Sequence, residues 1–401
     1  MTTLSTRCCV AGGGPAGMML GLLLARAGVD VIVLEKHADF LRDFRGDTIH
    51  PSTLEVMHEL GLLEAFLALP HTEVRELTGI VGGERIPIAD FSHLPVRCPF
   101  IALMPQWDFL DFLASHARRY PTFALRMSTG VVGLLEESGP VIGVSATAPD
   151  GPLEVRADLV VGADGRDSTV RAAAALRVET LGAPMDVLWF RLPRKPGGVD
   201  QTLVGRVEAG RIFVMLDRGD YWQCGFVIAK GTLDEIRARG LAAFREEVAR
   251  LAQTRADASV LRDWEDVKLL TVRVDRLARW FRPGVLCLGD AAHAMSPVGG
   301  VGINLAIQDA VAAANLLAAP LREGRLSAGD LARVQRRREW PTRVTQRMQV
   351  LVQNRIVRRV LQSRRPLRPP PAVRLLARFP RLRRLPGRLI GLGIRPEHVR
   401  V

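Results

Sequence analysis

The stretch RCCVAGGGPAGMMLGLLLARAGVDVIVLEK, residues 7–36, decides the fold. Residues 7–11 are predicted to form a short apolar strand, residues 15–27 a helix that is apolar on almost every side, and residues 29–36 a second strand rich in β-branched side chains. Strand, glycine turn, helix and strand in this order form a βαβ unit, which predicts an α/β fold of the Rossmann type. The glycines and the proline that interrupt this apolar stretch argue against a signal peptide or a membrane span.

The turn of this unit carries the spacing G-x-G-x-x-G at Gly12, Gly14 and Gly17. The first glycine permits a tight turn, the second lets backbone N–H groups approach a pyrophosphate, and the third lets helix and strand pack closely. Glu35 ends the second strand and is expected to accept hydrogen bonds from both ribose hydroxyls, which argues against a 2′-phosphate. The chain has no second such motif, so one dinucleotide, FAD or NAD, is predicted. Its expected contacts here are Gly12, Gly14, Pro15, Ala16, Gly17, Glu35 and Lys36.

The rest of the chain alternates between α/β and β-rich stretches. Helices are predicted over residues 51–60 and 106–119, and residues 153–175 again read as strand, turn and helix. Residues 187–228 consist of short alternating runs between glycine, proline and aspartate, which is typical of an antiparallel sheet. The α/β pattern returns at residue 285. The predicted cofactor domain is therefore discontinuous (residues 1–74, 101–178 and 268–345), with an inserted β-sheet domain (residues 75–100 and 179–267) and a basic C-terminal segment (residues 346–401).

The positive charge of the chain is concentrated in that last segment. The sequence has 55 basic and 42 acidic residues, a formal net charge of +13, and residues 355–401 contain fourteen arginines and a single acid, Glu397. Residues 1–354 are therefore electrically balanced. Because only four of the basic residues are lysine, the arginine excess indicates coding bias as much as phosphate binding, and no nucleic-acid partner is expected.

Two further features bear on the cellular setting. The five cysteines have no C-x-x-C spacing, which predicts free thiols in a reducing cytoplasmic compartment and no metal site. The leucines and prolines of the C-terminal segment do not form one clean amphipathic face. Short helices packed on the body are therefore favoured there, and peripheral membrane contact through the arginines stays an alternative. The oligomeric state is left open.

A second glycine-rich turn follows the apolar run VLCLGD, in GDAAHAMSPVGGVGINLAIQDA, residues 289–310. Asp290 stands at the carboxyl end of a strand, where α/β sheets contact their ligands. Pro297, Gly299 and Gly300 offer a flat backbone surface, because a Cβ atom on either glycine would obstruct close approach. A helix that begins near Gly302 directs its free N–H groups towards this surface.

Four motifs in this order resemble one protein family. They are the glycine loop at residues 12–17, Arg45-Gly46-Asp47, GADGRDSTVR at residues 162–171, and GDAAHAMSPVGGVGIN at residues 289–304. Together they resemble the FAD-dependent aromatic hydroxylases, single-component flavoprotein monooxygenases of the para-hydroxybenzoate hydroxylase type. The resemblance implies a Rossmann-like FAD-binding domain with an inserted β-sheet substrate domain, followed here by a helical, arginine-rich tail. It also implies FAD in an extended pose, NADPH or NADH as a transient co-substrate, and O2 as the oxidant.

The resemblance also assigns roles to single residues. Asp290 is expected to contact the ribityl chain, while Pro297, Gly299 and Gly300 support the flavin ring and the following helix faces flavin N1 and C2=O. Arg166, beside the Asp164-Gly165 motif, is a candidate for the nicotinamide phosphate. His293 suits a structural hydrogen bond better than a catalytic base. Further FAD contacts are expected at Arg45, Gln106, Asp164, Gly289, Val301, Gly302 and Asn304.

The predicted activity is hydroxylation of an aromatic, phenolic or quinone-like substrate through a C4a-hydroperoxyflavin, with no protein nucleophile. The substrate is expected under the β-sheet, with walls drawn from Trp189, Phe213, Met215, Trp222 and Gln223. Strand alternation allows half of these to face elsewhere. The alternatives are a flavin-dependent reductase of a prenyl or polycyclic substrate and a flavin-binding membrane-surface protein. A halogenase is not favoured, because the chain lacks a W-x-W-x-I-P stretch.

Overall fold

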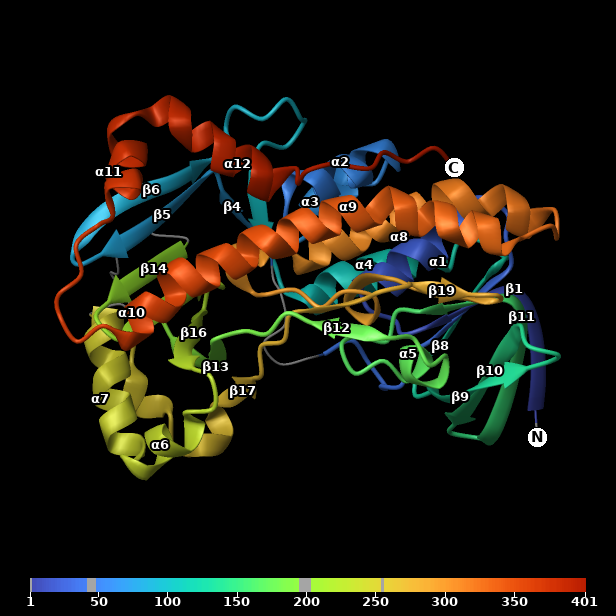
Figure 1. Cartoon of the computed structure of the whole chain (residues 1–401), viewed down its shortest axis with the longest axis horizontal. Coiled ribbons are helices and arrows are strands. Elements are labelled where there is room, and N and C mark those ends of the chain that lie inside the picture. Colours follow the sequence, from blue (N-terminus) through green and yellow to red (C-terminus); the bar gives the residue numbers. More distant parts are fainter. Residues whose placement is uncertain (1, 42–47, 195–202, 254–255) are drawn as a thin grey trace.

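The computed structural model describes residues 2–41, 48–194, 203–253 and 256–401, which form two units joined by a long helical layer (Figure 1). The first unit is built on an eight-stranded sheet with the order β19-β20-β11-β1-β2-β8, in which β10 and β9 extend from β11. Neighbours along β20, β11, β1, β2 and β8 are parallel, as βαβ connections require. The strands are β1 (Thr2–Ala11), β2 (Val31–Leu34), β8 (Phe123–Arg126), β9 (Gly130–Glu136), β10 (Val141–Ala148), β11 (Gly151–Gly162), β19 (Phe281–Arg282) and β20 (Val285–Cys287).

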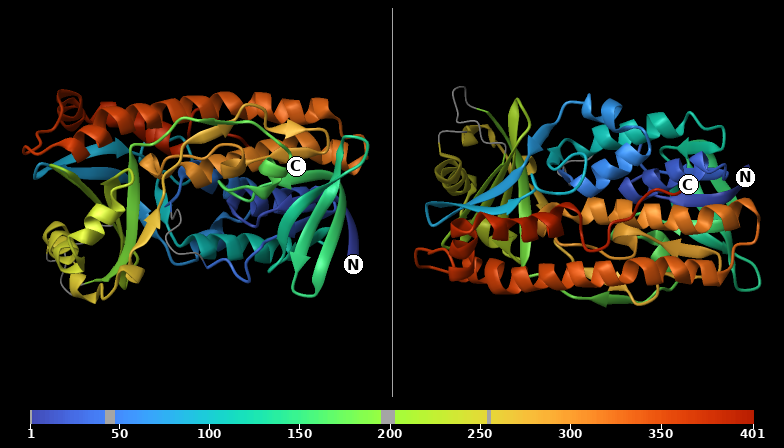
Figure 2. Two further views of the ribbon diagram at one scale, coloured as in Figure 1. Left: turned by 60° about the horizontal axis from the view of Figure 1, so that its bottom comes forward. Right: turned by 90° about the horizontal axis from the view of Figure 1, so that it is seen from above.

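Helices cover this sheet and bury its apolar side chains. Helix α1 (Pro15–Arg26) contacts both α4 (Gln106–Ala117) and α8 (Gly302–Arg322), and α8 in turn contacts α9 (Ala328–Val352). Figure 2 shows α8 and α9 side by side along the length of the molecule. By length and composition α8 could span a membrane, but 72% of its apolar window is buried in the protein, as expected for a core helix. Shorter helices of this unit are α2 (Pro51–Glu59), α3 (Leu63–Leu67) and α5 (Thr169–Ala173).

The second unit is a seven-stranded sheet with the order β17-β13-β16-β15-β14-β5-β6. All neighbours in it are antiparallel except β14 and β5. Its strands are β5 (Glu76–Val81), β6 (Glu84–Asp90), β13 (Met185–Pro193), β14 (Leu203–Glu208), β15 (Arg211–Asp217), β16 (Tyr221–Ala229) and β17 (Lys268–Leu270). This sheet therefore combines the two stretches predicted as the inserted domain, and β17 continues it three residues past the predicted boundary at 267.

One face of the second sheet packs against α6 (Leu233–Ala238) and α7 (Leu241–Ala252). Phe244 of α7 lies with its ring centroid 5.6 Å from that of Phe190 and 5.5 Å from that of Phe226. The opposite face, which carries Trp189 and Leu216, packs against Val74 and Ile101 of the small sheet β3-β7-β4. The second sheet is thus apolar on both faces. The remaining strands are β3 (Thr48–Ile49), β4 (Thr72–Val74), β7 (Ile101–Leu103), β12 (Val178–Thr180) and β18 (Asp275–Leu277).

The C-terminal segment crosses both units. After α9 the chain forms a short π-helix over Gln353–Val357, then α10 (Arg358–Gln362), α11 (Pro371–Arg378) and α12 (Arg384–Gly391). Helix α10 contacts β15 and β16, whereas α11 and α12 lie over β6 (Figure 1). A Cβ atom on Gly387 would lie 2.0 Å from the carbonyl oxygen of Asp90, so α12 packs directly on the β6 backbone. Between the start of α11 and the end of α12, four large apolar side chains are exposed: Leu375, Phe379, Leu382 and Leu385. Membrane contact at this surface stays a prediction.

Candidate active site

The three glycines of the first loop differ in what surrounds them. Gly12 has φ +104°, and a Cβ atom there would lie 2.5 Å from the carbonyl oxygen of Ala163. A Cβ atom on Gly17 would lie 1.9 Å from the carbonyl oxygen of Gly12. A Cβ atom on Gly14, the N-cap of α1, would meet nothing within 4 Å. The first and third glycines are therefore required for packing, whereas the second borders open space at a helix N-terminus, where anions bind.

Glu35 closes this loop from the end of β2. The residue is 8% exposed, and its carboxylate accepts hydrogen bonds from the backbone N–H groups of Gly13 (2.8 Å) and His37 (3.1 Å). These bonds hold the carboxylate next to the turn of the loop. The contact of Glu35 with ribose stays a prediction, as does the cofactor contact of its exposed neighbour Lys36.

Asp164 presents an unmatched acceptor beside the same loop. Its Oδ2 atom accepts a hydrogen bond from the backbone N–H of Val170 (3.1 Å), but its Oδ1 atom is buried and has no partner among the residues that the structure describes. The backbone of Asp164 lies against Gly12, since a Cβ atom on that glycine would be 2.8 Å from the Asp164 Cα atom. A buried oxygen of this kind needs a donor, and a hydroxyl or N–H group of a bound cofactor would supply one.

Asp290 and Arg166 are brought together although 124 residues separate them in sequence. Nη2 of Arg166 lies 3.6 Å from Oδ2 of Asp290, and Nη1 donates to the carbonyl oxygen of Thr271 (3.2 Å). Both side chains of the pair are about one-third exposed, so the pair contributes little to stability and either partner can exchange it for a ligand contact.

The second loop combines an open surface with a rigid support. Gly299 has φ +82°, and a Cβ atom there would touch only the Val301 side chain, at 3.6 Å, so the outer surface of the loop is open. On the inner side a Cβ atom on Gly300 would lie 2.7 Å from Oγ1 of Thr48. Nε2 of Gln349, on α9, donates to the carbonyl oxygens of Ser296 (3.0 Å) and Val298 (2.9 Å). A flat, supported surface next to the start of α8 at Gly302 is what a planar ring system requires, and Pro297 borders it.

The side chain of Asn304 is used by the protein itself. Its Oδ1 atom accepts hydrogen bonds from the backbone N–H of His50 (2.8 Å) and the hydroxyl of Thr53 (2.7 Å), and its Nδ2 atom donates to the carbonyl oxygen of Thr48 (3.1 Å). Asn304 thus joins the start of α8 to the start of α2. Its predicted contact with FAD stays a prediction.

His293 lies in the interior and faces another carboxylate. The residue is 1% exposed, its Nε2 atom is 2.6 Å from Oδ2 of the fully buried Asp309, and its ring packs on that of Trp280. Burial acts to raise the pKa of Asp309, but the charges and hydrogen bonds of His293 and Arg338 hold it below its usual range. This environment favours the structural hydrogen bond over the role of a catalytic base.

The predicted substrate residues divide between the two faces of the second sheet. Phe213, Met215 and Trp222 are at most 1% exposed and belong to the core beneath α7, so none of them lines a substrate site. Trp189 and Gln223 lie on the opposite face, because neighbours along a strand alternate in direction. The alternation was visible in the sequence, but the side that α7 covers was not.

Trp189 lies where this face meets the second glycine loop. Its side chain packs against the buried cluster that contains Leu216 and against a second cluster around Val187, which Val298 of the glycine loop also packs against. Its indole N–H is buried and has no hydrogen-bond partner within the described parts of the chain. The indole ring covers Gly225 of β16. Across the sheet, Gly225 pairs with Val214 on β15, Val214 pairs with Gly205 on β14, and Gly205 pairs with Gly79 on β5. Trp189 therefore covers the glycine of β16, and its indole N–H is a buried polar group whose partner is not among the described residues.

Sequence reasoning missed one cluster at the junction of the units. The guanidinium group of Arg191 lies 5.2 Å from the ring centroid of Tyr221 and 6.0 Å from that of Trp107. Trp107 follows Gln106, which begins α4 as predicted. The signal was available, since Arg191 lies two residues after Trp189 and therefore on the same face of the sheet. Arg45 lies outside the described residues.

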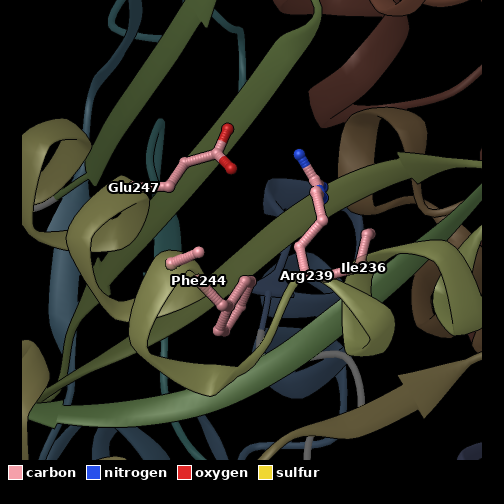
Figure 3. Close-up of a pocket in the computed structure, with 5 residues that line it drawn as sticks. Ile236, Arg239, Phe244 and Glu247 are labelled. Atoms are coloured by element: carbon pink, nitrogen blue, oxygen red, sulfur yellow. The ribbon is translucent and has the colours of Figure 1, made fainter.

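Figure 3 shows a small hollow on the other side of the second unit, lined by Ile236, Arg239, Phe244 and Glu247. These residues belong to α6 and α7, and Glu247 is paired with Arg211. The hollow lies on the side of the sheet away from Trp189, so it is not part of the candidate site.

Known proteins resemble this chain over most of its length. The model of the family described as FAD binding domain matches residues 5–348. The chain is similar to 6-methylpretetramide 4-monooxygenase of Streptomyces rimosus, at 35% identity over 86% of this chain and 83% of that protein. It is also similar to a rifampicin monooxygenase of Streptomyces venezuelae, at 32% identity over 75% of this chain but only 61% of the relative.

The fold is shared with a solved structure as well. p-Nitrophenol 4-monooxygenase from Pseudomonas putida superposes with a TM-score of 0.79 at 22% identity, over 98% of this chain and the whole of that one. At this level of identity the likeness concerns the fold alone. The mixed α/β fold with a cofactor-binding unit is therefore confirmed.

Proposed function

This chain belongs to the FAD binding domain family and is a flavin-dependent monooxygenase, and we propose the reaction that it catalyses. It uses NADPH or NADH and O2 to hydroxylate a phenolic or quinone-like aromatic ring. The relatives named above act on 6-methylpretetramide and rifampicin, and a substrate of related, polycyclic character is the most consistent choice here. The chain spans about three-fifths of the second relative, so activity, substrate and co-substrate belong to the proposal.

One observation carries the proposal: the two glycine loops converge. Gly289 lies between the starts of α1 and α8, since a Cβ atom there would be 3.3 Å from the Cβ atom of Ala16 and 3.2 Å from that of Ala306. The N-terminus of α1, the N-terminus of α8 and the unmatched oxygen of Asp164 thus lie around one region. Two helix N-termini suit an extended ligand with an anionic pyrophosphate and a second site of negative charge, and FAD has both.

The roles of the residues follow from their positions. The N–H groups at the start of α1 would bind the pyrophosphate, Glu35 the adenosine ribose, and Asp290 the ribityl chain. FAD, when bound, supplies the redox chemistry: it accepts a hydride from the nicotinamide and uses O2 to deliver one oxygen atom to the substrate. The N-terminus of α8 would stabilise negative charge on the ring, as oriented dipoles do where charge develops.

The second sheet supplies the substrate side and excludes water. Trp189 and Leu216 pack in a buried apolar cluster with Val74 and Ile101 of the small sheet, so an aromatic ring on this face would sit in a low-dielectric environment. The indole N–H of Trp189 would donate to a carbonyl or phenolic oxygen of the substrate. Gln223 would offer a second polar contact on the same face.

The experiment measures FAD retention, then turnover on a panel of phenols, quinones and polycyclic aromatics. Oxidation of NADPH or NADH is scored together with product mass, because oxidation without product indicates only peroxide release. Isotopically labelled O2 should place one labelled oxygen atom in the product. A protein that retains no flavin refutes the cofactor assignment, and turnover that proceeds without O2 identifies the flavin-dependent reductase instead.

A further inference from the structure

Buried polar contacts connect the second glycine loop to α9. The carboxylate of Asp309 is 0% exposed, and its Oδ2 atom accepts hydrogen bonds from the backbone N–H of Gly289 (3.2 Å) and from Nε2 of His293 (2.6 Å). Nε of Arg338, on α9, donates to the other oxygen of the same carboxylate (2.9 Å). Asp309 therefore joins α8, α9 and the turn that begins at Gly289.

Arg338 extends these contacts to the end of the chain. Its Nη1 atom donates to the carbonyl oxygen of Arg395 (3.1 Å) and to Oε1 of Glu397 (3.3 Å). Glu397 also accepts two parallel hydrogen bonds from Arg337, at 2.6 and 2.9 Å. The side chain of Glu397 is 5% exposed, so the only acid of the arginine-rich segment acts on these two guanidinium groups and not on the surface.

A guanidinium group that is buried between two carboxylates is sensitive to the loss of either one. Arg338 is 1% exposed, and without the negative charge of Glu397 its Nη1 atom would lose a charged acceptor where water is scarce. Either the side chain shifts towards Asp309 or water enters beside it. Both changes weaken the hold of Asp309 on Gly289, which directly precedes Asp290.

We propose that Glu397 is a positioning residue of the FAD site: through Arg338 and Asp309 it holds Gly289, and with it Asp290, in the geometry that the cofactor requires. The inference rests on the proposed function, because it takes Gly289 and Asp290 to face FAD. The C-terminal segment is then part of the cofactor site, although about a hundred residues of sequence separate Glu397 from that turn.

The segment has a second anchor, which separates this role from mere docking. Glu59 of α2 accepts a hydrogen bond from the backbone N–H of Val399 (2.7 Å) and pairs with His398. Glu59→Gln weakens the attachment of the same segment without touching Arg338. Glu339→Gln is the matched control on α9, because it removes an ion pair with Arg343 whose partners are 25% and 51% exposed.

The test reconstitutes the full-length apoprotein with FAD and measures the dissociation constant, then the visible circular dichroism of the flavin at saturating FAD. Glu397→Gln should weaken FAD binding on the order of tenfold, the scale of coupling through such networks, and should change the flavin signal even when every site is filled. Glu339→Gln should behave as wild type, and Glu59→Gln should have a much smaller effect than Glu397→Gln. In an Asp309→Asn background, Glu397→Gln should have no further effect, because the connection is already broken.

Three results would overturn the inference: a wild-type dissociation constant and flavin signal in Glu397→Gln, an equal loss in Glu59→Gln, or additive losses with Asp309→Asn. If Asp309→Asn does not fold, the flavin signal of Glu397→Gln at saturating FAD decides alone. A wild-type protein that binds no FAD refutes the proposed function itself.

Discussion

Gly14 and Gly17 lie three residues apart in the same loop, yet their replacement by alanine should have opposite effects. Gly14 has φ −73° and ψ −175°, an extended conformation that alanine adopts freely, and its Cβ atom would meet no protein atom within 4 Å. Gly14→Ala should therefore leave the FAD-free protein intact, or stabilise it by about 0.4–1 kcal/mol through the unfolded chain. The new methyl group would occupy the space in which the pyrophosphate approaches the backbone.

The magnitude for Gly14→Ala follows from the loss of one hydrogen bond between a backbone N–H and a phosphate oxygen. Such charge-assisted bonds contribute about 1.5–3 kcal/mol, so the dissociation constant of FAD should rise roughly 10- to 100-fold. Gly17→Ala places its Cβ atom 1.9 Å from the carbonyl oxygen of Gly12, and relief requires α1 to move away from β1. We expect a loss of about 3 kcal/mol in the stability of the FAD-free protein.

Flavin fluorescence quenching on titration of apoprotein measures the first effect, and thermal unfolding without flavin measures the second. The reasoning fails if Gly14→Ala binds FAD as tightly as wild type. It also fails if Gly14→Ala unfolds at as low a temperature as Gly17→Ala, since the space around Gly14 would then be needed for folding.

Three further predictions concern single side chains. Asp164→Asn keeps the bond to Val170 but lacks the charge of the unmatched oxygen, so FAD affinity should fall roughly tenfold with little change in thermal stability, and unchanged affinity would contradict the assignment. Trp189→Phe removes the buried indole N–H, which has no protein partner among the described residues. The KM for the aromatic substrate should rise about 5- to 10-fold while the stability of the apoprotein is kept, and an unchanged KM would show that Trp189 does not contact the substrate. Burial lowers the pKa of His50 from 6.5 to about 4, so the unfolded chain binds the proton at a higher pH than the folded protein does. The free energy of unfolding should therefore be highest above pH 6.5, decline by about 2 kcal/mol towards pH 5 and decline further towards pH 4. Chemical unfolding of His50→Gln should lack this part of the decline, and an equal dependence of stability on pH in wild type and variant would contradict the prediction.

Local sequence signals predicted the βαβ unit and the helix starts well. Glycine spacing, a proline at the first helical position and β-branched strands act within a few residues of one another, so the helix begins at Pro15 and α4 begins at Gln106 as expected. Gln106 and Pro15 are positions where the local preference and the fold agree.

Long-range partners were not predictable from the sequence. Trp189 and Trp222 both lie on strands in which apolar and polar residues alternate. Which of the two belongs to the core under α7 depends on where Phe244 packs, and this cannot be read from the strands themselves. The side chain of Asn304 is used by residues about 250 positions earlier in the chain. No local pattern announces either contact, because both depend on how distant elements meet.

The two apolar faces of the second sheet have a consequence for how such a protein can diversify. On β13, β15 and β16, one set of alternate side chains builds the core under α7, and the other set, which includes Trp189, Val214 and Gln223, faces the first unit. Substitutions in the second set leave the packing with Phe244 untouched. The same scaffold can therefore vary the face towards the candidate site without disturbing the core under α7, and a library restricted to these alternate positions should yield altered specificity while the packing around Phe244 is kept.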